Sequence, residues 1–142
     1  MSDTEKDLSQ KILETAKNLF AEKGYHGMSM REISEALGVS KAALYYYFKD
    51  KEELFLAILK IYLDELSAAL DRISVEPVSS AEKVRLFVEY VLTQPAEQRS
   101  TIRLASQEIN QLSPEARKTF GLIYQEKFIQ KMQAILQEGM DQ

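Results

Sequence analysis

The chain has 142 residues, of which 45% are hydrophobic and 28% charged, as in an ordinary globular protein. It contains no cysteine, which excludes disulfides and thiolate metal sites, and its one histidine, His26, is too few for a zinc site without several carboxylates. No apolar run is long enough to span a bilayer, and the N-terminus lacks the apolar core of a signal peptide. We therefore expect a cytoplasmic protein with no cofactor, no metal and no membrane partner.

The net charge of −4 and the pI of about 5.1 argue weakly against a nucleic-acid partner. The local field at a contact matters more than the total charge, however, and Lys41, Lys49 and Lys51 lie close together with only Asp50 among them. Taken alone, these lysines are equally well explained as a solvated charged surface.

Apolar residues recur at helical spacing from Leu8 to Phe20, which predicts an amphipathic helix over about residues 8–23. Residues 1–7 read as a polar lead. We expect Gly24 to end this helix, because glycine tolerates the left-handed backbone found just past a helix C-terminus.

Two short helices are predicted next. Ser29 can cap the first, and Gly38 ends it. Ser40 can cap the second, in which Leu44 and Phe48 form the apolar stripe. Two short helices joined by a tight turn that contains glycine are the signature of a helix-turn-helix.

The remainder also reads as helices. A long one is predicted over residues 51–73, and its broad apolar stripe requires a second packing partner. A linker over 74–80 precedes a helix that ends before Pro95, another over 98–111, and a last one from Ser113 to Gly139. No strand pattern is present, so the predicted fold is all-α with about seven helices.

The stretch from Ser29 to Lys51 resembles the DNA-binding motif of TetR-type transcriptional repressors. Ser29 stands where that family more often has threonine. The matching residues are Gly38, Val39, Ser40, Leu44, Tyr45, Tyr47, Phe48 and the run Lys51, Glu52, Glu53, Leu54, with Ala16, Phe20, Gly24 and Tyr25 upstream.

The resemblance implies a helix-turn-helix DNA-binding domain over residues 1–50 and a helical effector-binding domain over residues 51–142. Family members usually continue through two further helices, which form the homodimer. We therefore expect the second domain to be C-terminally truncated here, and the chain to be a fragment of a protein that is a homodimer at full length.

In a helix-turn-helix the first residues of the second helix face the base edges. Lys41 can donate to guanine O6 and N7, small Ala42 and Ala43 allow close approach, and Lys51 suits a phosphate at a helix N-terminus. Arg31, Tyr46 and Tyr47 are assigned by analogy with the family. The predicted contacts to double-stranded operator DNA are Arg31, Ser40, Lys41, Ala42, Ala43, Tyr45, Tyr46, Tyr47 and Lys51.

The resemblance also implies a cavity for a small-molecule effector, which we expect to be largely apolar because no charged cluster marks the later helices. Core packing alone also explains each candidate. The predicted lining residues are Tyr62, Leu66, Phe87, Tyr90, Val91, Ile102, Phe128 and Met132.

The predicted function is a ligand-responsive transcriptional regulator, a repressor that a small molecule releases from its operator. An enzyme is not favoured, because the chain has one histidine, no cysteine and no glycine-rich phosphate loop. The other alternative is a helical protein-interaction module without DNA binding, against which the lysines around the tyrosines weigh.

Overall fold

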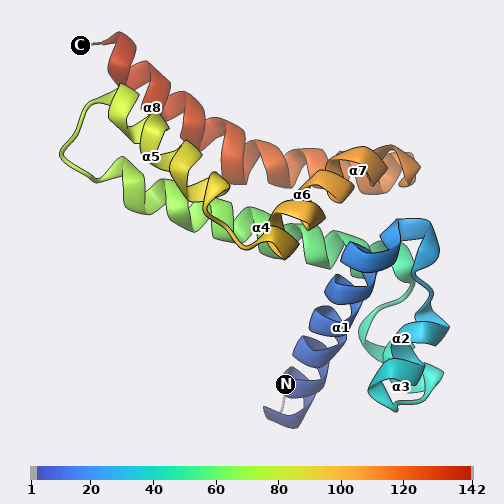
Figure 1. Ribbon diagram of the computed structural model, residues 1–142. Coiled ribbons are helices and arrows are strands. Elements are labelled where there is room, and N and C mark those ends of the chain that lie inside the picture. Colours follow the sequence, from blue (N-terminus) through green and yellow to red (C-terminus); the bar gives the residue numbers. More distant parts are fainter. Residues whose placement is uncertain (1–2, 142) are drawn as a thin grey trace.

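The computed structural model describes residues 3–141, and in that range the chain is helical with no strand (Figure 1). Helices α7 and α8 join through the π-helical segment η2 into one continuous rod, so the prediction of about seven helices is confirmed. No described helix is both long and apolar enough to cross a membrane. The elements are α1 (Asp3–Gly27), α2 (Met30–Leu37), α3 (Lys41–Tyr47), α4 (Lys51–Ser74), α5 (Ser80–Leu92), α6 (Ala96–Glu108), η1 (Ile109–Gln111), α7 (Pro114–Tyr124), η2 (Gln125–Ile129) and α8 (Gln130–Met140).

Side-chain caps fix the beginnings of the three helices after α1. Ser29, Ser40 and Asp50 each accept a hydrogen bond from the backbone N–H three residues later, at 3.1, 3.1 and 2.8 Å. Gly38 ends α2 in the left-handed conformation, with φ of 67°. The predicted helix-turn-helix is therefore confirmed down to its caps.

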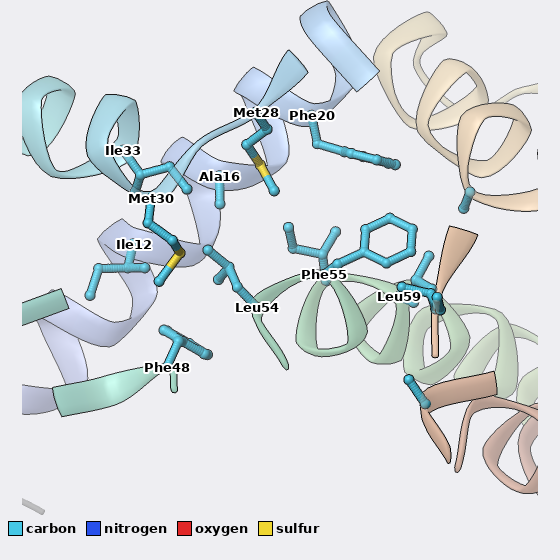
Figure 2. Packing of buried hydrophobic residues seen from close by; sticks show 14 of the residues in the cluster. Ile12, Ala16, Phe20, Met28, Met30, Ile33, Phe48, Leu54, Phe55 and Leu59 are labelled. Carbon is cyan, nitrogen blue, oxygen red and sulfur yellow. The ribbon is translucent and has the colours of Figure 1, made fainter. Parts of the chain in front are cut away.

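One hydrophobic core joins α1, α2, α3 and the first half of α4 (Figure 2). Phe20 of α1 and Phe55 of α4 lie at its centre, with ring centroids 4.7 Å apart. The same core continues into Ala105 of α6 and Ala116 of α7, so packing does not stop at residue 50. The division into domains at that residue stays a prediction, and α4 serves both parts.

A second, smaller cluster holds the far end of α4 against α5 and α8, through Leu70, Phe87 and Ile135. Beside it the buried ammonium of Lys83 donates to the carbonyl of Ser74 at 2.9 Å and to the carboxylate of Glu138 at 3.0 Å. A buried charge is tolerated when it is paired and hydrogen-bonded in this way.

The structure corrects several predicted helix limits. Helix α1 begins at Asp3, where acidic residues in the first turn suit the helix dipole, rather than at residue 8. Gly24 interrupts α1 at φ of 76°, and a short helical turn follows it. Gly139 does not end the last helix, which runs to Met140. Two apolar residues of α5, Val88 and Leu92, are exposed.

Gly139 permits a close approach between α8 and α5. A Cβ atom there would lie 2.7 Å from the Cβ and Oγ of Ser80, whose hydroxyl donates to the carbonyl of Ile135 at 2.5 Å. We therefore predict that Gly139→Ala lowers the free energy of unfolding by about 1–2 kcal/mol through overpacking, as measured by urea denaturation.

The matched control is Gly121→Ala, because Gly121 also lies inside a helix but a Cβ there meets nothing within 4 Å. This control should gain up to about 1 kcal/mol from helix propensity. If both substitutions change the free energy of unfolding equally, the approach of Ser80 to residue 139 does not exclude a Cβ atom there.

Candidate functional site

Helix α3 presents its polar and aromatic side chains outward. Lys41 and Ala42, at its first turn, are exposed, and Tyr46 is 75% exposed. Leu44, on the side of the helix opposite Ala42 and Tyr46, is fully buried in the core and fixes the helix in place. The short helix is thereby anchored along one side and free along the other.

The three consecutive tyrosines differ in environment. Tyr45 is 47% exposed, whereas Tyr47 is half-buried and packs edge-on against the ring of Tyr46, with centroids 5.1 Å apart. Burial raises the pKa of Tyr47, and the carboxylate of Glu5 raises it further. Tyr47 therefore remains a neutral phenol that can donate a hydrogen bond at physiological pH.

Two predicted phosphate contacts already have partners. Arg31 is exposed but donates through Nε to the Glu35 carboxylate at 2.9 Å, along one side of α2. The ammonium of Lys51 lies 4.2 Å from the ring centroid of Tyr25, and partial burial lowers the pKa of this lysine. Ser40 is engaged as the cap of α3, and Ala43 is half-buried and supplies the N–H to that cap.

A polar junction, which was not predicted from the sequence, links the end of α1 to the end of α6. The carboxylate of Glu108 accepts a hydrogen bond from the backbone N–H of Tyr25. It also lies so close to Gly24 that a Cβ atom there would be 2.7 Å from Oε1. A glycine is therefore needed at position 24 for two reasons: its φ is positive, and the Glu108 carboxylate leaves no room for a Cβ atom.

Two further contacts extend the junction to the start of α4 and of α7. Glu52 accepts hydrogen bonds from the backbone N–H of Ser113 at 2.9 Å and from its hydroxyl at 2.6 Å. A hydrogen bond of 3.0 Å joins the His26 ring to Gln111. His26 is therefore a partner in the junction.

A cavity of about 340 Å³ lies among α4, α6, α7 and η2. None of its described lining side chains is charged, and Ser106 and two tyrosines supply the only polar atoms on them. The lining residues are Leu59, Tyr62, Leu63, Leu66, Ile102, Ala105, Ser106, Ile109, Phe120, Tyr124 and Phe128.

The predicted effector residues divide into three groups. Tyr62, Leu66, Ile102 and Phe128 line this cavity. Tyr90 and Val91 line a much smaller adjoining cavity, which also contacts Tyr62. Phe87 and Met132 pack instead in the second hydrophobic cluster.

Phe120 and Tyr124 also line the cavity, although neither was predicted to do so. These two and Phe128 recur every four residues, and their rings stack in succession with centroids 5.9 and 5.3 Å apart. That spacing was visible in the sequence, but it equally fits a buried helix face, so only the position of α4 and α6 distinguishes a cavity wall from core.

Residues 12–58 match the family described as bacterial regulatory proteins, tetR family. The repressor AcnR of Corynebacterium efficiens is 49% identical over 51 residues, which are 36% of this chain and 27% of AcnR. The regulator QacR of Staphylococcus aureus is 38% identical over 87 residues, 61% of this chain and 46% of QacR.

The structure is also similar to that of PfmR, a TetR family transcriptional regulator from Thermus thermophilus. The TM-score is 0.74 and the identity 33%, over 92% of this chain and 70% of PfmR. This chain therefore belongs to the TetR family of transcriptional regulators. It matches less than half the length of the curated relatives, from 21% to 46% of each. These relatives are transcriptional regulators and not enzymes.

The junction yields a test of how α6 supports the helix-turn-helix. Glu108→Ala leaves the Tyr25 N–H without its acceptor, so we predict a loss of about 1–2 kcal/mol in the free energy of unfolding by urea denaturation. The neighbouring exposed residue provides the control, since Gln107→Ala should change stability by less than about 0.5 kcal/mol. If Glu108→Ala changes the free energy of unfolding as little as Gln107→Ala does, water replaces the carboxylate as the acceptor for the Tyr25 N–H.

Proposed function

We propose that the protein is a ligand-responsive transcriptional repressor that binds operator DNA through α2 and α3 and is released by a small apolar molecule. The observation that carries the proposal is the helix-turn-helix itself, in which α3 is capped by Ser40, anchored by Leu44 and exposed at Lys41. Because the proposed partner is genomic DNA, the proposal includes a cytoplasmic location.

In this proposal α3 enters the major groove, and Lys41 contacts a base edge. Ala42 lies against the groove. Tyr45 and Tyr46 contact phosphates or sugars from the exposed side of α3, and half-buried Tyr47 does so through its hydroxyl. Arg31 leaves its ion pair with Glu35 and contacts DNA instead. The loss in free energy is small, because exposed ion pairs contribute only about 0–1 kcal/mol. The net charge of −4 does not oppose this, since the basic groups are local.

The protein acts as a homodimer in this proposal. Two recognition helices must lie about 34–36 Å apart to read successive major grooves. One module buries only about 600–1,000 Å² of its surface on DNA, which favours a paired arrangement for tight binding. Sedimentation velocity of the protein measures this state directly.

Effector binding reaches the helix-turn-helix through elements shared with the cavity. Helices α4 and α6 both line the cavity, and both contact α1, by Phe55 against Phe20 and by Glu108 at Tyr25. A ligand that moves α6 therefore moves the anchor of α1. The coupling requires only that the ligand bind the released arrangement more tightly than the DNA-bound one.

For base reading, we predict that Lys41→Ala weakens binding to operator DNA by about 1–3 kcal/mol and relaxes the preference at one base pair. Fluorescence anisotropy with DNA from upstream of the protein's own gene, compared with random DNA, measures both effects. The control is Lys60→Ala, an exposed lysine on α4. An equal loss on both DNAs would make Lys41 a phosphate contact, and no binding by the wild-type dimer would refute the proposed function.

For phosphate contact, Lys51→Ala should weaken binding evenly across sequences and lower the log–log salt slope by about one. This requires the Lys51 ammonium to leave the Tyr25 ring when DNA binds, which its partial exposure permits. Titrations at several salt concentrations measure the slope. An unchanged slope with a lower urea midpoint would assign Lys51 to packing against Tyr25 alone.

A further inference from the structure

We infer that Tyr62 determines the specificity of the cavity, which takes a neutral, flat, apolar molecule carrying one hydrogen-bond acceptor for the Tyr62 hydroxyl. The inference rests on the proposed function, in that the cavity is the effector site, and it adds the chemical class of the effector. Three features of the cavity support it.

The first feature is an unsatisfied hydroxyl. Tyr62 is only 5% exposed, and its hydroxyl has no hydrogen-bond partner among the described residues. Buried polar side-chain atoms nearly always have a partner, and leaving one without a partner is costly. Tyr62 lines both the main cavity and the small adjoining one, so a molecule in this space can supply the missing partner.

The second feature is a flat aromatic wall. The rings of Phe120, Tyr124 and Phe128 stack in succession with interplanar angles of 21° and 28°. All three line the main cavity. Aromatic pairs favour offset stacking, so such a wall suits a flat ring system.

The third feature is the absence of a counter-charge on the described cavity lining. A charged ligand would lose its hydration there without an ion pair in return. Glu65 lines the adjoining cavity and not this one. Lys17 of α1 places its ammonium 5.3 Å from the Tyr62 ring centroid, where it disfavours a second cation on that ring.

The test uses two probes of nearly equal shape, 2-acetylnaphthalene with a carbonyl acceptor and 2-isopropenylnaphthalene without one. Isothermal titration of the protein with each probe gives the ratio of their affinities. On Tyr62→Phe this ratio should shift against the acetyl probe by roughly threefold to tenfold, the worth of one hydrogen bond. On Tyr124→Phe, which changes another cavity tyrosine, the ratio should stay unchanged.

Two further arms use 2-naphthoate and 2-naphthyltrimethylammonium, both of which should bind at least tenfold more weakly than the acetyl probe. Tighter binding of either ion, an unchanged ratio on Tyr62→Phe, or no binding of any probe would overturn the inference. Urea denaturation of unliganded Tyr62→Phe should show an equal or higher midpoint, because the substitution removes an unsatisfied hydroxyl. A lower midpoint would mean that the hydroxyl is already satisfied, and would also overturn it.

Operator binding is titrated on the same samples without any probe. Failure of the unliganded wild type to bind operator would refute the proposed regulator, whatever the probes do. Intact operator binding together with a failed probe test would refute only the assignment of Tyr62 and of the ligand class.

Discussion

Helix α4 buries one long apolar stripe against two different sets of partners, and the rest of the structure depends on this sharing. Its first half, around Leu54 and Phe55, closes the core beneath α2 and α3. Its second half, around Leu70, packs on α5 and α8. Neither of these two packed regions could bury its apolar surface without α4, so a displacement of α4 changes the packing of both.

The cavity lies along the middle of α4, between these two packed regions. Tyr62 belongs to the first core and at the same time lines the cavity. The site for a ligand is therefore continuous with the packing that orients α3. Figure 1 shows α2 and α3 near one end of α4 and the end of α8 at the other, with the rod of α7 and α8 running along α4.

The features predictable from the sequence were those whose causes lie within a few residues of one another. The caps at Ser29, Ser40 and Asp50 and the left-handed turn at Gly38 follow from residue type and spacing alone. The helix-turn-helix and the all-α class were therefore predictable. The outward position of Ala42 and Tyr46 was predictable as well, because both lie on the side of the helix opposite Leu44.

Contacts between distant parts of the chain were beyond local signals. The hydrogen bond of Glu108 to Tyr25 spans 83 residues, and that of Glu52 to Ser113 spans 61. The placement of the Lys51 ammonium on Tyr25 also depends on how α1 and α4 meet. Periodicity shows which side of a helix is apolar, but not whether the space beside it is filled. It therefore predicted both Phe87 and Phe128 as cavity residues, although only Phe128 lines the cavity and Phe87 is packed in the second cluster.

The π-helical segment η2 has a consequence for how this rod tolerates change in length. A π segment is a local widening equivalent to one residue inserted into an α-helix. Because the wider turn takes up that extra residue, removing one residue there would restore a regular helix and leave α7 and α8 facing the same partners. Removing one residue within α8 would instead rotate the part beyond it by about 100°. A deletion before Ile135 would then turn Ile135 away from Leu70 and Phe87, and Gly139 away from Ser80. The C-terminal rod can therefore lose one residue in η2, but not in α8, without changing which side chains pack.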